Sequence, residues 1–193
     1  MRPQLYLLAS GLFNQPTHIR LKGLHSLLSE LLSTMPTDAP WRKTLIALES
    51  HLNDDKNLEV EYSRLFILAF PNATVQPYGS YWIETEQCLM GRSTMEVKEM
   101  MAEYGIEVAE NTGLLPDHIV SELEFMAYLA NQEDEKVVQT QRQLLEQHLV
   151  RWTPQFITAL KKAEPAPYYQ LAADFLDQLI NSDVQELIVP NRS

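Results

Sequence analysis

Hydrophobic residues recur along this chain at the three- and four-residue spacing of helices that bury one face. One such stripe consists of Leu21, Leu24, Leu28 and Leu31, and similar stripes follow in nearly every later segment. No two segments show the alternating pattern that predicts a pair of β-strands. The pattern therefore predicts an all-α fold, a single compact multi-helix bundle in which residues 1–193 form one domain.

Turn and capping residues predict where individual helices begin and end. Ser93–Glu96 has the spacing of a capping box, and Gly105 suits the end of the helix that follows. Pro116 suits the first position of a helix. Thr153–Pro154 predicts a fresh helix start, and Glu164–Pro167 predicts a break before the last helix.

Composition limits the partners of the chain. The sequence has 26 acidic residues against 15 lysines and arginines, a net charge of −11, so nucleic acid is not expected to bind. It contains only 6 glycines and no phosphate-binding loop, which argues against a glycine-loop nucleotide-binding fold. No apolar run reaches the ~18 residues of a membrane span, so stable membrane insertion is not expected.

The N-terminal segment and the single cysteine indicate a cytoplasmic protein. Residues 5–13 resemble a short signal-peptide core, but no Ala-x-Ala cleavage site follows and the helical pattern continues. Cys88 has no second cysteine with which to form an internal disulfide. The same count excludes a cysteine-ligated metal cluster.

The sequence contains none of the motifs that would identify an enzyme. The glycine fingerprints of nucleotide-binding proteins and the Gly-x-Ser-x-Gly of hydrolases are missing, and His18, His25, His51 and His148 occur singly without ligand spacing. We therefore predict a protein that is not an enzyme and that carries no cofactor.

Three segments differ from ordinary helical sequence. Glu61–Phe66 places Tyr62, Leu65 and Phe66 on one helical face, which by itself indicates a core helix flanked by an ion pair. Pro77–Trp82 is an aromatic turn, which by itself indicates rings that cover the core.

The third segment, Leu114–Met126, opens a helix with Pro116, Asp117 and His118. Glu122 lies one turn after His118, within reach of its ring. By itself the segment indicates a capped helix start with a first-turn carboxylate and a surface histidine.

Taken together and in this order, the three segments resemble the TorD/DmsD/NarJ family of cytoplasmic chaperones that serve bacterial molybdoenzyme maturation. The resemblance spans most of the chain and implies a TorD-like helical bundle. It implies that the protein binds the twin-arginine leader and the apo form of a molybdopterin oxidoreductase catalytic subunit, and delays export until cofactor insertion. The residues that would line or support the leader-binding region are Tyr62, Leu65, Phe66, Tyr81, Trp82, Pro116, Asp117, His118 and Glu122.

The chemistry of such a leader suits this chain. A twin-arginine leader has a basic region followed by an apolar region, which carboxylates and an apolar groove can bind. We predict Asp117 as the main carboxylate, with Glu122 or Glu124 as helpers. His118 would hydrogen-bond the peptide backbone or orient Asp117.

Several alternatives stay open at this point. The client could be a trimethylamine N-oxide, dimethyl sulfoxide, nitrate or formate enzyme, and the chaperone could be a monomer or a homodimer. A second function is a small metal-dependent hydrolase that uses Asp117, His118, Glu122 and Glu124. A third is a permanent structural subunit of a larger complex.

Overall fold

A computed structural model describes residues 1–52, 55–67 and 73–189, and within these ranges the regular structure is helical. The α-helices are α1 (Arg2–Phe13), α2 (His18–Thr34), α3 (Arg42–Glu49), α4 (Asp55–Phe66), α5 (Gly79–Ile83), α6 (Arg92–Ala102), α7 (Ile119–Ala130), α8 (Glu135–Leu144), α9 (Val150–Lys162) and α10 (Pro167–Asp183). Shorter turns are the 3-10 turn η1 (Glu110–Thr112) and the π-helical turns η2 (Leu145–Leu149) and η3 (Val184–Ile188). The predicted all-α class is confirmed.

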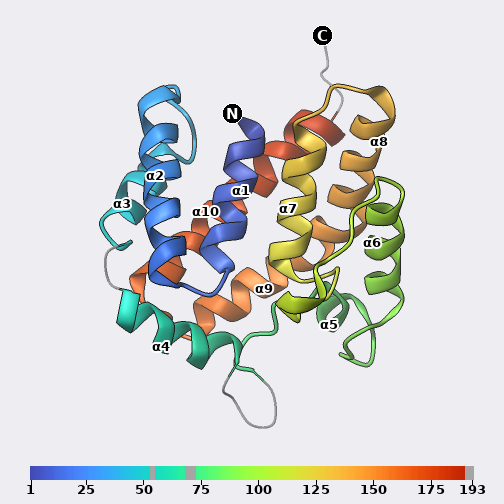
Figure 1. Cartoon of the computed structure of the whole chain (residues 1–193), viewed down its shortest axis with the longest axis horizontal. Coiled ribbons are helices and arrows are strands. Elements are labelled where there is room, and N and C mark those ends of the chain that lie inside the picture. The colour runs from blue at the N-terminus through green and yellow to red at the C-terminus, as the bar shows by residue number, and fades with distance from the viewer. Residues whose placement is uncertain (53–54, 68–72, 190–193) are drawn as a thin grey trace.

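The first helix lies at the centre of the bundle. Figure 1 shows α1 beside α7 and α10, with α2 and α3 on one side and α6 and α8 on the other. Helix α1 buries residues on most of its circumference, among them Tyr6, Leu8 and Leu12 with no exposed surface. A helix that is apolar nearly all round must be enclosed by its neighbours, which explains its position.

Polar contacts tie this central helix to the other end of the chain. The guanidinium Nε of Arg2 and the hydroxyl of Tyr6 both donate to Oδ2 of Asp183, over 2.8 Å and 2.5 Å. Burial, and then the Asp183 charge, raises the pKa of Tyr6 well above its ordinary value. The phenol therefore stays a hydrogen-bond donor over the whole physiological pH range.

Helix α7 is almost as enclosed as α1, against which it packs. The side chains on most of its faces are buried, while Glu124 and Tyr128 are exposed on one side. None of the helices in the described ranges is both long enough and apolar enough to cross a membrane.

Three of the predicted helix boundaries are wrong. Ser93 is not an N-cap, because α6 begins at Arg92 and the Ser93 hydroxyl donates to Glu84 rather than pairing with Glu96. Pro116 precedes α7 by three residues, because His118 caps that helix instead.

The predicted helix start at Thr153–Pro154 is also wrong, because Pro154 lies inside α9. The π-helical turn η2 joins α8 to α9, and the Thr153 hydroxyl donates to the Leu149 carbonyl over 2.7 Å. Helix α9 thus continues through Pro154 without a new N-cap. Gly105, by contrast, has the predicted left-handed conformation just after α6, with φ +67°.

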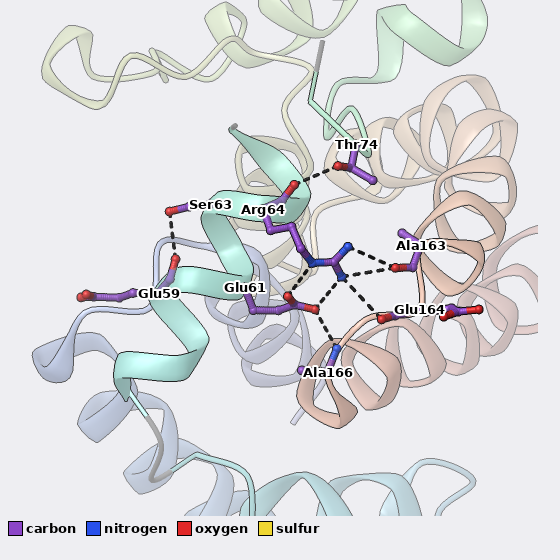
Figure 2. Close-up of polar contacts among 8 residues, drawn as sticks. All are labelled: Glu59, Glu61, Ser63, Arg64, Thr74, Ala163, Glu164 and Ala166. Atoms are coloured by element: carbon purple, nitrogen blue, oxygen red, sulfur yellow. Dashed lines mark hydrogen bonds and ion pairs between the residues drawn. The ribbon is translucent and has the colours of Figure 1, made fainter. Parts of the chain in front are cut away.

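An ion pair on α4 fastens the connection between α9 and α10 (Figure 2). Arg64 donates to both carboxylate oxygens of Glu61, over 2.7 Å and 2.8 Å. Both Nη atoms of Arg64 lie 3.2 Å from the carbonyl oxygen of Ala163, where α9 ends. Glu61 in turn accepts the backbone N–H of Ala166, the residue before α10, over 2.8 Å.

This clamp (Glu61, Arg64 and the Ala163–Ala166 turn) satisfies backbone groups that neither helix can satisfy itself. The guanidinium also complements the negative end of the α9 dipole. The hydrogen bonds from Arg64 lower the pKa of Glu61 below its ordinary value. The pair predicted as a simple flank of a core helix therefore links segments about a hundred residues apart.

We expect Arg64→Met to lower the free energy of unfolding by about 1–2 kcal/mol, because one guanidinium holds both Glu61 and the end of α9. Arg92→Met is the matched control, since within the described ranges Arg92 pairs with Glu96 of its own helix and its side chain is 87% exposed. The control should change stability by less than about 0.5 kcal/mol. Urea denaturation measures both, and equal losses would contradict the clamp.

Candidate functional site

Two of the three segments singled out in the sequence, Pro77–Trp82 and Leu114–Met126, meet through backbone hydrogen bonds. The N–H of Gly79 donates to the carbonyl of Asp117 over 2.8 Å, and the N–H of Ile119 donates to the carbonyl of Pro77 over 2.9 Å. Tyr78 and His118 form the isolated antiparallel bridge between them. This junction fixes the start of α5 against the start of α7.

The Asp117 carboxylate lies inside the junction and has no exposed surface. Its Oδ2 accepts the backbone N–H of Ser80 over 2.7 Å, while Oδ1 is buried without a partner among the described residues. The expectation of a first-turn carboxylate on α7 is therefore wrong. Asp117 precedes α7 and binds the first turn of α5 instead.

His118 is the N-cap of α7, and the expectation of a surface histidine is wrong because its exposed fraction is 3%. Its Nδ1 accepts the N–H of Val120 over 3.1 Å, and its ring meets that of Tyr78 with centroids 4.9 Å apart. Burial lowers the pKa of His118 to about 3. The ring is therefore neutral at physiological pH, as an accepting Nδ1 requires.

Glu122 follows on the first turn of α7 and is fully buried. Trp152 on α9 donates its indole N–H to Oε2 of Glu122 over 3.4 Å. Burial, and then the Asp117 charge, raises the pKa of Glu122 well above its ordinary value. The raised pKa favours the protonated, uncharged form of the carboxyl, which limits the charge enclosed in this junction.

Gly79 is required at this point by close approach. A Cβ there would lie 3.1 Å from Nε1 of Trp152 and 3.2 Å from Oε1 of Glu122. Both neighbours are buried, so neither can move aside freely. The glycine lets α5 pack directly on the carboxyl of α7 and the indole of α9.

The remaining segment, Glu61–Phe66, reaches the junction through a series of contacting aromatic rings. Tyr62 contacts Phe66 (centroids 5.3 Å apart), Phe66 stacks on Phe156 (6.3 Å), and Phe156 meets Trp152 (5.5 Å). Leu65 and Phe66 are buried, as the shared face predicts, while Tyr62 is half-buried.

Solvent reaches a smaller set of the predicted site residues. Tyr81 and Trp82 on α5 are half-buried and meet edge to face with centroids 5.1 Å apart. The indole N–H of Trp82 donates to the carbonyl of Gln76 over 2.8 Å, which fixes its orientation. The predicted residues with accessible surface are Tyr62, Tyr81, Trp82 and Pro116, and those inside are Leu65, Phe66, Asp117, His118 and Glu122.

The opposite side of α7 borders a groove of about 420 Å³ that the sequence analysis missed. It lies between α7 and the segment that follows α6, and Glu107 and Glu124 are the charged residues that line it. The other lining residues are Met101, Ile106, Val108, Ala109, Thr112, Leu114, Ser121, Phe125 and Tyr128. The one available signal was charge, because residues 99–135 contain ten acidic residues and no lysine or arginine.

The four residues proposed for a metal-dependent hydrolase do not converge. Glu122 faces Trp152, whereas Glu124 accepts the Ser10 hydroxyl over 3.1 Å and lines the groove. Among the residues that the structure describes, no three His, Cys, Asp or Glu side chains are grouped so as to hold a metal ion.

A sequence model for the nitrate reductase delta subunit family matches residues 34–158, a range that contains all three segments. The chain belongs to this family. The resemblance to the TorD/DmsD/NarJ chaperones drawn from the three segments is thereby confirmed.

Individual members of the family are similar over most of the chain. The Tat proofreading chaperone DmsD of Salmonella typhi is 29% identical over 140 residues, which cover 72% of this chain and 66% of that protein. The chaperone protein TorD of Vibrio cholerae is 26% identical over 153 residues, which cover 73% and 69%. The chain thus spans about two thirds of the length of the curated relatives it matches.

A solved structure shows the same fold. A crystal structure described as that of a redox enzyme maturation protein from Archaeoglobus fulgidus superimposes with a TM-score of 0.63 at 26% identity. The superposition covers 93% of both chains. The TorD-like helical architecture is therefore confirmed over nearly the whole length.

We expect His118→Asn to keep more stability than His118→Ala, by about 1 kcal/mol, because asparagine can cap a helix and alanine cannot. Both variants lose the ring contact with Tyr78, so the difference between them isolates the cap. Thermal or urea unfolding measures it. Equal stability of the two variants would show that Nδ1 of His118 contributes nothing to the start of α7.

A second prediction concerns pH. Because the pKa of Glu122 is raised in the folded state, its protonated form contributes stability below the unfolded-state pKa, and that contribution is lost as pH rises toward the folded-state pKa. Glu122→Gln removes this dependence. Between pH 5 and 7 the variant should therefore gain stability relative to the unmodified protein, by up to about 1.4 kcal/mol per pH unit.

Glu84→Gln is the control for that measurement. A backbone hydrogen bond from Ser93 lowers the pKa of Glu84, so its contribution is lost only as pH falls below the unfolded-state value. Its stability relative to the unmodified protein should stay constant from pH 5 to 7. A flat difference for Glu122→Gln as well would mean that Glu122 is ionised inside the folded protein.

Proposed function

We propose that the chain is a cytoplasmic, system-specific chaperone of redox-enzyme maturation. It binds the twin-arginine leader and the apo catalytic subunit of a molybdopterin oxidoreductase and holds them back from export until the cofactor is inserted. The family match over residues 34–158 carries this proposal, because that range contains every segment that resembles the leader-binding chaperones. A relative named Tat proofreading chaperone DmsD supports it.

The exposed part of the site suits a peptide ligand. Tyr62 on α4 and Tyr81 and Trp82 on α5 present ring surface, and Pro116 adds apolar surface just before α7. Aromatic rings offer large contact areas at little entropic cost, and their faces attract guanidinium groups. This surface would bind part of a leader by contact alone, so the proposed role makes and breaks no covalent bond.

The buried residues act as positioning residues in this proposal. Asp117 receives the Ser80 N–H, His118 caps α7, and Glu122 receives the Trp152 indole. Their burial keeps a leader arginine from reaching them in the observed conformation. Together with Leu65 and Phe66 they hold α5 and α4 where the exposed rings can meet a ligand.

We expect a synthetic twin-arginine leader to bind the purified protein, with an affinity that falls as salt rises. The chain carries −11 and the leader is basic, so screening weakens their attraction as the Debye length shrinks from about 10 Å at 0.1 M salt to about 3 Å at 1 M. Calorimetry against leaders of the four candidate enzyme classes tests this. Failure of every leader to bind would contradict the proposed function.

The role of Asp117 can be separated from that of a direct arginine ligand. Asp117→Asn keeps an oxygen that accepts the Ser80 N–H but loses the charge, whereas Asp117→Ala loses both. If Asp117 only positions α5, the asparagine variant should keep leader affinity within about threefold, and the alanine variant should lose about tenfold or more. Equal losses in the two variants would instead identify the carboxylate charge as a direct contact.

A further inference from the structure

The groove beside α7 is built by the fold itself. Gly105 turns the chain at the end of α6, and the N–H of Ile106 donates back to the carbonyl of Met101 over 3.1 Å. Gly113 has the same left-handed conformation, with φ +66°, just after η1. The segment between these two glycines therefore runs beside α7, and the groove lies between that segment and the helix.

The lining of the groove is apolar with carboxylates beside it. Six of the lining side chains are large and apolar or aromatic: Met101, Ile106, Val108, Leu114, Phe125 and Tyr128. Tyr128 is 43% exposed, whereas the other tyrosines are buried or half-buried. A volume of about 420 Å³ is within the range of about 300–1,000 Å³ typical of ligand sites.

Charge restricts what can occupy this groove. Glu107 and Glu124 line it, and the continuous stretch 99–135 around it has no lysine or arginine. Such a setting attracts cationic ligands and repels anionic ones. Another surface pocket of the described chain differs in this respect, because Arg92 and Arg151 line it together with two glutamates.

The groove and the site already described lie on two sides of the start of α7. Leu114 and Ser121 line the groove, and the Pro116–His118 segment lies between them in sequence. Glu122 on the same helix faces the junction with α5 and α9, whereas Glu124 and Phe125 face the groove. One elongated ligand could therefore contact both sides of the start of α7.

We propose that this groove binds the apolar stretch of the leader peptide, with a neighbouring arginine of the leader placed against Glu107 and Glu124. This assignment rests on the proposed function, since it places one part of the same ligand. An apolar groove with carboxylates beside it is complementary to a peptide in which a cationic segment adjoins an apolar one. The aromatic surface of α4 and α5 then contacts the remaining part of the leader.

Substitutions in the groove test this by calorimetry with a synthetic leader that binds the unmodified protein. Tyr128→Ser and Val108→Ser should each weaken leader binding by about tenfold, the effect of removing one apolar side chain from a contact. Ile46→Ser is the matched control, because Ile46 is 51% exposed on α3. The control should leave the affinity unchanged.

Glu107→Gln tests the charge. It should weaken leader binding and flatten its salt dependence, while Glu30→Gln on α2, with the same change in net charge, should do neither. Each variant is checked by thermal unfolding, so that a fold defect is recognised. Equal behaviour of Glu107→Gln and Glu30→Gln would overturn the place given to the arginine.

A photo-crosslink locates the peptide directly. A leader carrying benzoylphenylalanine in its apolar stretch should label residues 101–128 of the unmodified protein, as read by mass spectrometry. Labelling confined to residues 62–82 would overturn the inference and leave the proposed function standing. Self-association abolished by Tyr128→Ser, with leader affinity unchanged, would show that a second copy of the chain occupies the groove, which also overturns it.

The two proposals fail differently. If no leader binds the unmodified protein, the proposed function fails and the groove assignment fails with it. If a leader binds with normal affinity to every groove variant, only the groove assignment fails.

Discussion

The structure around the site depends on one backbone pairing, that of residues 77–79 with residues 117–119. It brings three ionisable side chains out of water together, where uncharged forms and hydrogen bonds lower the cost of burial. Burial disfavours the charged forms of His118 and Glu122, and Oδ2 of Asp117 accepts a backbone N–H. Because little charge is buried, this polar cluster can lie within an apolar bundle. Its contacts fix where α5, α7 and α9 meet.

The bundle itself was predictable from periodicity, because stripes such as Leu21, Leu24 and Leu28 need only a neighbour to cover them. The helix boundaries were harder to predict from the sequence, since tertiary contacts determine them. Ser93 binds Glu84 from a preceding loop, and Pro154 lies inside α9, which follows directly on the π-helical turn η2. A local sequence motif does not reveal a hydrogen-bond partner that lies elsewhere in the chain.

The candidate site divides in the same way. Residue type alone drew attention to Asp117, His118 and Glu122, but their burial depends on a pairing with a segment nearly forty residues earlier. The groove residues escaped notice because Phe125 and Leu114 have the apolar character of core residues. Only the three-dimensional path of the segment after Gly105 separates a side chain that lines a groove from one that fills the interior.

The contact of Tyr6 with Asp183 has a consequence for how the chain is made. The two residues are 177 positions apart, so α1 leaves the ribosome long before α7 and α10 exist to enclose it. A helix apolar on nearly every face is then exposed until those helices have been made, the condition under which nascent chains aggregate. Until α10 has been made, α1 is therefore expected to need the help of general chaperones.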